Sequence, residues 1–200
     1  MSDEIVLLLN LAFVTAGALC FLFGLAVGSF LNVCIWRLPR EESVVRPGSH
    51  CPACGTALGA RDLVPVLSWL ALRGKCRFCG AKISPRYLAV ELLTGALFVW
   101  CYLRFGLSSE LAPSLIFSAF LVAITFIDLD HQIILDGMLA LLAAAGLGLG
   151  LWLGQPGFVD MLIGVGVGGG LLLALAVISG GGMGGGDVKY AAALGFWLGW

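Results

Sequence analysis

The chain has 200 residues, of which 60% are apolar and only 12% are charged, and its mean hydropathy is +1.03. Soluble domains are usually about 45–50% apolar and about 25% charged. A soluble globule of this length cannot bury so much apolar surface, so the composition excludes an ordinary cytosolic protein. The apolar residues are enough for about six membrane spans of roughly 20 residues each. Disorder is excluded as well, because the charge is low. Collagen and coiled coil are excluded because the sequence has neither a G-X-Y repeat nor a heptad repeat.

The predicted elements are almost all apolar helices, separated by one long polar segment. The first span covers residues 1–36, and residues 37–86 form a loop domain. The remaining spans lie near residues 87–105, 111–127, 137–154 and 159–179, and a sixth begins after Asp187. This sixth helix reaches the last residue before it attains the roughly 20 residues that a span needs. The sequence therefore predicts an all-α polytopic membrane protein, and we expect its membrane domain, residues 87–200, to continue beyond Trp200.

The basic residues are concentrated in the loop. Nine of the eleven lysines and arginines lie between Arg37 and Arg86, where there are only three acidic residues. Short basic loops face the cytoplasm, so we expect the N-terminus outside and the loop inside. Counting spans then places residues 128–136 and 180–187 on the same cytoplasmic face. A basic loop alone does not indicate nucleic-acid binding, and none is expected.

Four of the seven cysteines form two C-x2-C pairs in this loop. Cys51 and Cys54 are separated by 21 residues from Cys76 and Cys79. Paired C-x2-C elements at about this separation are typical of tetrahedral zinc sites. Four thiolates would close the coordination shell, which indicates a structural Zn²⁺. The alternative is a pair of disulfides, which the reducing cytoplasm disfavours.

Carboxylates at the ends of two predicted spans are candidates for chemistry, because ionisable residues at membrane depth are costly. Asp128 and Asp130 end the third span, and Asp187 follows a glycine-rich stretch against which an extended peptide could lie. The alternatives are a solvated helix end for Asp128 and Asp130, and helix N-caps for Asp136 and Asp187. Two carboxylates on one face can also form an aspartic-protease dyad, and we expect Asp128 and Asp187 to be that pair.

With these motifs, the sequence resembles the type IV prepilin leader peptidases that are also N-methyltransferases, a family of membrane aspartic proteases with a GxGD motif. The resemblance covers essentially the whole chain. Besides the two C-x2-C pairs, the motifs that carry it lie at residues 28–33, 37–39, 67–70, 72–77, 83–87, 90–92, 128–131 and 184–189.

The resemblance implies a function and a set of site residues. The catalytic aspartates of the family fall on Asp128 and Asp187. The same motifs supply the supporting residues Asp130, Gly184, Gly186 and Lys189. Such enzymes cleave the basic leader of prepilins and pseudopilins at the cytoplasmic face of the inner membrane. They serve type IV pili and type II secretion, and their substrates are membrane-embedded helices.

The family also methylates the new N-terminus with S-adenosylmethionine, and the zinc-bearing loop is associated with this methylating form. We expect Glu91 and Arg86 to serve the methyltransferase or the substrate, although a plain interfacial ion pair is an equally good interpretation. The alternatives for the whole chain are a peptidase without methylation, a membrane assembly scaffold, and an ion-relay transporter. No inverted repeat is evident, which weakens the transporter hypothesis.

Overall fold

The computed structural model describes residues 2–180 and 182–200, so Gly181 of the glycine-rich stretch lies outside the described residues. Within the described residues the structure has two isolated β-bridges and no strand. The prediction of an all-helical fold is therefore confirmed. The α-helices are α1 (Ser2–Arg37), α2 (Leu67–Ala71), α3 (Pro85–Phe105), α4 (Leu111–His131), α5 (Asp136–Leu153), α6 (Phe158–Ile178) and α7 (Gly185–Leu198).

Five helices are long and apolar enough to cross a membrane, by length and composition, and they correspond to the predicted spans one to five, with ends that differ by a few residues. The predicted sixth helix is present as α7, but it has only 14 residues. It begins at Gly185, three residues earlier than predicted, because the last glycines of the glycine-rich stretch join its first turn. With its five candidate spans, the chain is a multi-pass membrane protein.

The chain divides into two compact units, which we describe separately. The first unit extends to Ala123, and the second comprises Ile124–Trp200. Helix α4 contributes its first part to one unit and its last turns to the other.

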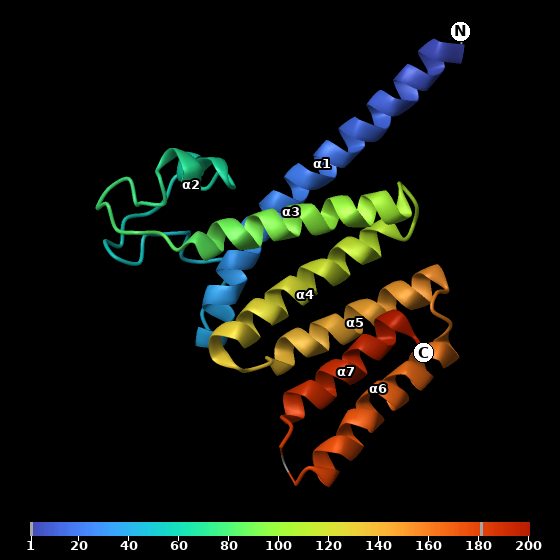
Figure 1. Ribbon diagram of the computed structural model, residues 1–200. Coiled ribbons are helices and arrows are strands. Elements are labelled where there is room, and N and C mark those ends of the chain that lie inside the picture. Colours follow the sequence, from blue (N-terminus) through green and yellow to red (C-terminus); the bar gives the residue numbers. More distant parts are fainter. Residues whose placement is uncertain (1, 181) are drawn as a thin grey trace. The chain divides into compact units, whose positions relative to one another are not determined.

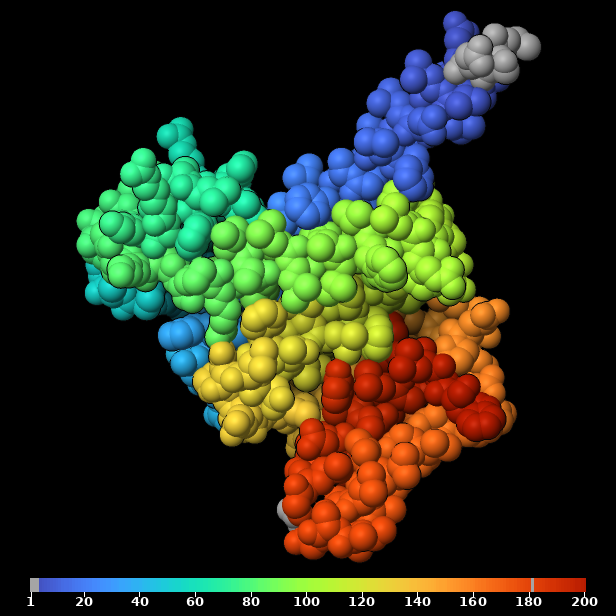
Figure 2. Space-filling model, in the orientation of Figure 1, coloured from blue at the N-terminus to red at the C-terminus, as the bar shows by residue number. Residues whose placement is uncertain are grey.

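In the first unit, α1 and α3 cross at glycines. A Cβ atom added at Gly24 would lie 2.7 Å from Cα of Gly95, and one added at Gly28 would lie 2.8 Å from Cα of Glu91. Only glycine fits at such distances, and small residues are the usual means by which helices approach closely in lipid. The N-terminal turns of α1 stand clear of the rest of this unit (Figure 2), and their apolar side chains are exposed. A lipid surface is the environment that suits such a segment.

In the second unit, α7 lies between α5 and α6 (Figure 1). Helices α6 and α7 meet at Gly164 and Gly195, because the Cβ position of Gly164 is 2.9 Å from the carbonyl oxygen of Gly195. Helices α5 and α7 are joined by the indole N–H of Trp197, which donates to the carbonyl oxygen of Leu142 over 2.8 Å. Close backbone packing on one side and a directional hydrogen bond on the other hold α7 in place.

Helices α5 and α7 run parallel to each other. Asp136, at the start of α5, contacts Lys189 near the start of α7, and Leu142 contacts Trp197 further along both helices. The two helix N-termini therefore lie at the same end of the unit, which is also where α4 ends (Figure 1). This end of the unit carries the aspartates that the sequence singled out.

Candidate functional site

The four loop cysteines lie in two knuckles with matching backbone hydrogen bonds. In the first knuckle, the N–H of Cys51 donates to the Thr56 carbonyl over 2.9 Å, and the N–H of Gly55 donates back to Cys51 over 2.8 Å. In the second, Cys76 pairs with Ala81 over 2.8 Å, and Gly80 donates back to Cys76 over 3.0 Å. Gly55 and Gly80 have φ of +71° and +73°, a left-handed conformation that glycine adopts at little cost.

The four sulfur atoms fit a tetrahedral metal ion. All of them lie within 4.8 Å of one another, and the Sγ atoms of Cys51 and Cys79 are 3.8 Å apart. A Zn–S bond of about 2.3 Å places tetrahedral sulfurs about 3.8 Å from each other. The donor set and the distances suit Zn²⁺, and no disulfide joins the cysteines of the described residues. The sequence-based prediction of a four-cysteine cluster able to bind zinc is confirmed in geometry.

Hydrogen bonds, burial and neighbouring sulfurs shift the pKa values of three thiols in the cluster. Hydrogen bonds from Thr56 lower the pKa of Cys54 to about 6. Backbone N–H groups of Cys79 and Phe78 lower the pKa of Cys76. For Cys79, a hydrogen bond from Ala81 acts to lower the pKa, but desolvation and the neighbouring sulfurs outweigh it and raise the pKa to about 11. Sulfurs packed this closely cannot all ionise without a cation, which is the role that a bound metal would fill.

A buried arginine anchors the segment that leads into the first knuckle. Arg37, at the end of α1, is only 6% exposed. Its guanidinium donates three hydrogen bonds to backbone carbonyls, over 2.9 Å to Ser43, 2.8 Å to Pro47 and 3.2 Å to Gly48. Arginine suits this task because its planar fork presents several donors at once. The loop is thus attached to the membrane helix just before Cys51.

Glu91 holds a second part of the loop. Its side chain on α3 is 8% exposed and accepts the N–H of Val66 over 2.7 Å. Val66 has φ +62° and is the middle residue of a γ-turn, in which Leu67 donates to the Pro65 carbonyl over 2.6 Å. This type of turn is rare and strained. Glu91 therefore binds the loop backbone, a role that the sequence did not indicate. The assignment of Glu91 and Arg86 to the methyltransferase or the substrate stays a prediction.

Asp128 and Asp130 lie in the last turns of α4, and both are exposed. Helix α4 continues to His131, four residues beyond the predicted span. A short segment then leads to α5, and Ile134 in this segment meets the start of α7: the Cβ position of Gly186 is 3.2 Å from Cβ of Ile134. The contact places the first turn of α7 against the connection that leaves Asp128.

Asp187 is the third residue of α7, and it is exposed. The N-cap of this helix is Gly184, so the alternative that Asp187 caps the helix was wrong. Asp136 is likewise the first residue of α5 and not its cap, which is Leu135. At the end of the glycine-rich stretch, Gly184 is extended, whereas Gly185 and Gly186 are already helical. The pairing of Asp128 with Asp187 stays a prediction.

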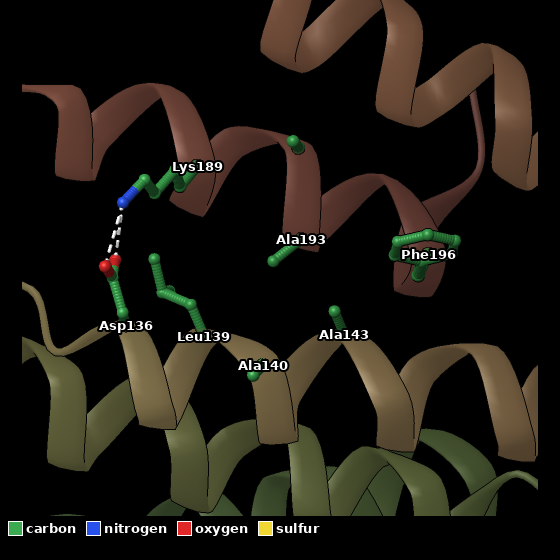
Figure 3. A pocket seen from close by; sticks show the side chains of 8 residues that line it. Asp136, Leu139, Ala140, Ala143, Lys189, Ala193 and Phe196 are labelled. Carbon is green, nitrogen blue, oxygen red and sulfur yellow. Dashed lines mark hydrogen bonds and ion pairs between the residues drawn. The ribbon is translucent and has the colours of Figure 1, made fainter.

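The structure pairs Asp136 with Lys189, which the sequence did not indicate. The ammonium group of Lys189 donates to both carboxylate oxygens of Asp136, over 2.8 Å and 2.9 Å (Figure 3). The pair lies at the mouth of a cavity of about 350 Å³ between α5 and α7. Apolar residues line the rest of it, namely Leu139, Ala140, Ala143, Ala192, Ala193 and Phe196. No spacing rule joins residues 53 positions apart, so this contact needed the tertiary structure.

Comparison with known proteins identifies the family of this chain. Residues 22–105 match the bacterial peptidase A24 N-terminal domain, and residues 115–200 match the type IV leader peptidase family. A prepilin leader peptidase/N-methyltransferase of Bacillus subtilis is 39% identical over 186 residues, which cover 91% of this chain and 73% of the relative. The chain belongs to the type IV leader peptidase family. The family and the enzyme class expected from the motifs are thereby confirmed.

Other members of the type IV leader peptidase family are also similar to this chain. A prepilin leader peptidase/N-methyltransferase of Myxococcus xanthus is 51% identical over 148 residues, which cover 74% of this chain. In that comparison the chain spans 44% of the relative's length. A type 4 prepilin-like proteins leader peptide-processing enzyme of Escherichia coli is 40% identical over 201 residues, with 88% of this chain and 74% of the relative covered. No solved structure matches the chain.

Proposed function

We propose that the protein cleaves the leader peptides of prepilins and pseudopilins, with Asp128 and Asp187 as its catalytic carboxylates. The names of its relatives in the type IV leader peptidase family support the substrate class. The observation that carries the residue assignment is the approach of Gly186 to Ile134, which packs the first turn of α7 against the connection after Asp128. The two aspartates thus come from two helices that end and begin at one end of the second unit.

Two carboxylates in this arrangement can hydrolyse a peptide bond between them. Neighbouring carboxylates do not ionise together easily, so one of them keeps a proton. The ionised carboxylate accepts a proton from the attacking water, and the protonated one donates a hydrogen bond to the scissile carbonyl. Asp130, two residues after Asp128 in the last turn of α4, would have a supporting role beside the catalytic pair.

The glycines before Asp187 keep the space around its carboxylate open. A Cβ atom at Gly184 would lie 3.4 Å from Oδ2 of Asp187, and the corresponding position of Gly186 is already in contact with Ile134. A side chain at Gly184 would crowd the Asp187 carboxylate, and a side chain at Gly186 would push the first turn of α7 away from Ile134. This is the physical reason to assign Gly184 and Gly186 supporting roles.

A second proposed activity is methylation of the new N-terminus. The relatives' full names support it, and S-adenosylmethionine would supply the methyl group. In the first unit, Cys51, Cys54, Cys76 and Cys79 would hold a structural Zn²⁺, because four sulfurs leave no open coordination position. Glu91 and Arg86 are the proposed residues for this activity or for the substrate, with Glu91 acting at least by holding the Val66 turn.

We place the protein in the inner membrane, with the N-terminus outside and the loop and both aspartates on the cytoplasmic side. The support is the excess of basic residues in residues 37–86. The partners would be prepilins, pseudopilins and membrane lipid. Reporter fusions in the loop and in residues 106–110 test the topology: the loop fusion should be active only as a cytoplasmic reporter, and the other only as an external one.

The decisive experiment is co-expression with a prepilin, read by the intact mass of the pilin. Asp128→Asn and Asp187→Asn should each abolish leader removal, whereas Asp160→Asn should leave it intact. Asp160 is a matched control because it is an exposed aspartate in the first turn of α6, at the other end of the second unit. Full cleavage by either of the first two variants would disprove the dyad.

The same mass spectrum separates the two activities. A processed pilin with one added methyl group supports the transferase, and an unmethylated product of the wild-type enzyme removes it. If assembly of pili continues unchanged in both dyad variants, the protein acts as a scaffold and not as the processing enzyme.

A further inference from the structure

The position of Asp187 depends on how the first turn of α7 is held. The chain enters this helix through Gly182, Met183 and Gly184, and Gly185 and Gly186 begin the helix itself. Glycine restricts the backbone less than any other residue, so this approach does little to fix the rotation or height of α7. The restraint has to come from contacts that α7 makes with its neighbours.

On the side that faces α5, α7 makes two directional side-chain contacts. Trp197 donates to the Leu142 carbonyl near the end of α7, and Lys189 binds Asp136 near its start. The second contact lies two residues from Asp187, and both Asp136 oxygens accept from the same ammonium group. The Lys189 and Trp197 contacts lie near opposite ends of α7, so together they oppose sliding of α7 along α5.

Lys189 and Asp187 lie on different sides of α7. Lys189, Ala193 and Phe196 are spaced along one side of α7 and line the same cavity against α5 (Figure 3). Residues two positions apart in a helix do not share a face, so the Asp187 carboxylate points in another direction. Lys189 therefore influences Asp187 through the placement of the helix and not by touching the reacting atoms.

We propose that Asp136 and Lys189 are positioning residues that set the register of α7 against α5 and thereby place Asp187 opposite Asp128. The proposal rests on the proposed peptidase function. An exposed ion pair adds little to global stability. Loss of this ion pair should therefore reduce the turnover of the peptidase and leave the melting temperature nearly unchanged.

The first test removes the charges singly in the full-length enzyme. Lys189→Met and Asp136→Asn should lower kcat for leader cleavage between about 10-fold and 100-fold, as displacements of about 1 Å in an active site do. KM should stay within about twofold, because neither residue is expected to touch the substrate. Lys189→Arg keeps the charge and should keep most of kcat. A melting curve of each variant shows whether the fold is intact.

The second test makes the contact titratable. In Lys189→His, the imidazole is charged below a pH of about 6.5 and neutral above it, so kcat should fall as the pH rises through this range. The ratio of kcat in Lys189→His to kcat in Lys189→Arg isolates this effect. The other titratable groups of the second unit are common to both variants and cancel, namely Asp128, Asp130, His131, Asp136, Asp160, Asp187 and Tyr190.

The outcomes separate this proposal from the proposed function. If Asp128→Asn and Asp187→Asn are inactive but Lys189→Met has wild-type kcat, the positioning role is wrong and the dyad stands. If the ratio of Lys189→His to Lys189→Arg does not change with pH, the charge of residue 189 does not act on the reaction, and the proposal also fails. Full activity of the dyad variants would overturn the proposed function instead.

Discussion

Each of the two units is stabilised internally by a different kind of interaction. In the first unit, a polar loop is fixed by individual atoms: four sulfurs, the Arg37 guanidinium on three carbonyls, and the Glu91 carboxylate on the Val66 N–H. In the second unit, apolar helices are held mainly by backbone contact at glycines, and the side-chain contacts of Lys189 and Trp197 add direction. A loop of this composition has little apolar surface to bury, so it depends on ligands and hydrogen bonds. The packing of helices in lipid depends on close shape complementarity.

The comparison predicts that removing one zinc ligand has the largest effect. Cys76→Ser should abolish stoichiometric zinc binding and unfold the loop locally, because metal binding supplies about 10–16 kcal/mol in small structural sites. Zinc content by atomic absorption and protease cleavage within residues 37–84 measure the change. Cys20→Ser, in α1 and outside the cluster, is the matched control. A Cys76→Ser protein with full zinc and a resistant loop would refute the assignment.

The next largest effect should come from filling the α6–α7 contact. A Cβ atom at Gly195 would clash with the backbone of Gly164 and Val165, so Gly195→Leu should destabilise the second unit by about 3 kcal/mol. Thermal unfolding in detergent or bilayer measures this, with Gly170→Leu as the control. A Cβ atom at Gly170, in α6, meets nothing within 4 Å, so this variant should unfold near the wild-type temperature. Equal stability of both variants would contradict the glycine contact.

A smaller effect is expected where Glu91 holds the γ-turn. Glu91→Gln removes the charge but keeps the shape, and loss of a buried charged acceptor should cost about 1–3 kcal/mol of local stability. Amide hydrogen exchange in residues 63–67 should become faster. Glu110→Gln, an exposed residue between α3 and α4, should not change it. Unchanged exchange in Glu91→Gln would mean that the Val66 turn is held by other contacts.

The smallest effect concerns the ion pair within the loop. The guanidinium of Arg77 lies 2.8 Å from Oδ1 of Asp62, but its side chain is 45% exposed. Such pairs contribute about 0–1 kcal/mol, and less at high salt. Arg77→Met should therefore leave the zinc content unchanged and only modestly speed zinc transfer to a chelator, and high salt should reduce the difference. Zinc loss as large as that of Cys76→Ser would place Arg77 among the essential contacts.

Much of the chain could be predicted from the sequence, because the relevant signals are local. Apolar runs of sufficient length predicted α1 and α3–α7, with ends within a few residues, whereas the short helix α2 in the loop was not predicted. The cysteine spacing predicted a cluster because each C-x2-C pair forms one tight turn, and two such turns need only be brought together. The errors at Asp136 and Asp187 were also local: the helices began one or more residues earlier than expected, so these aspartates lie inside the first turns and not at the caps.

What the sequence alone determined is therefore the membrane character, the order of the helices and the residue types available for chemistry. These follow from hydropathy and short-range spacing, which act within one turn or one span. The pairing of Lys189 with Asp136, the contact of Glu91 with Val66 and the placement of Gly186 on Ile134 were decided only by the tertiary structure. Each joins residues at least 25 positions apart in the chain. Such contacts depend on which helix faces meet, and helix packing in lipid is set by close shape complementarity, which no local pattern records.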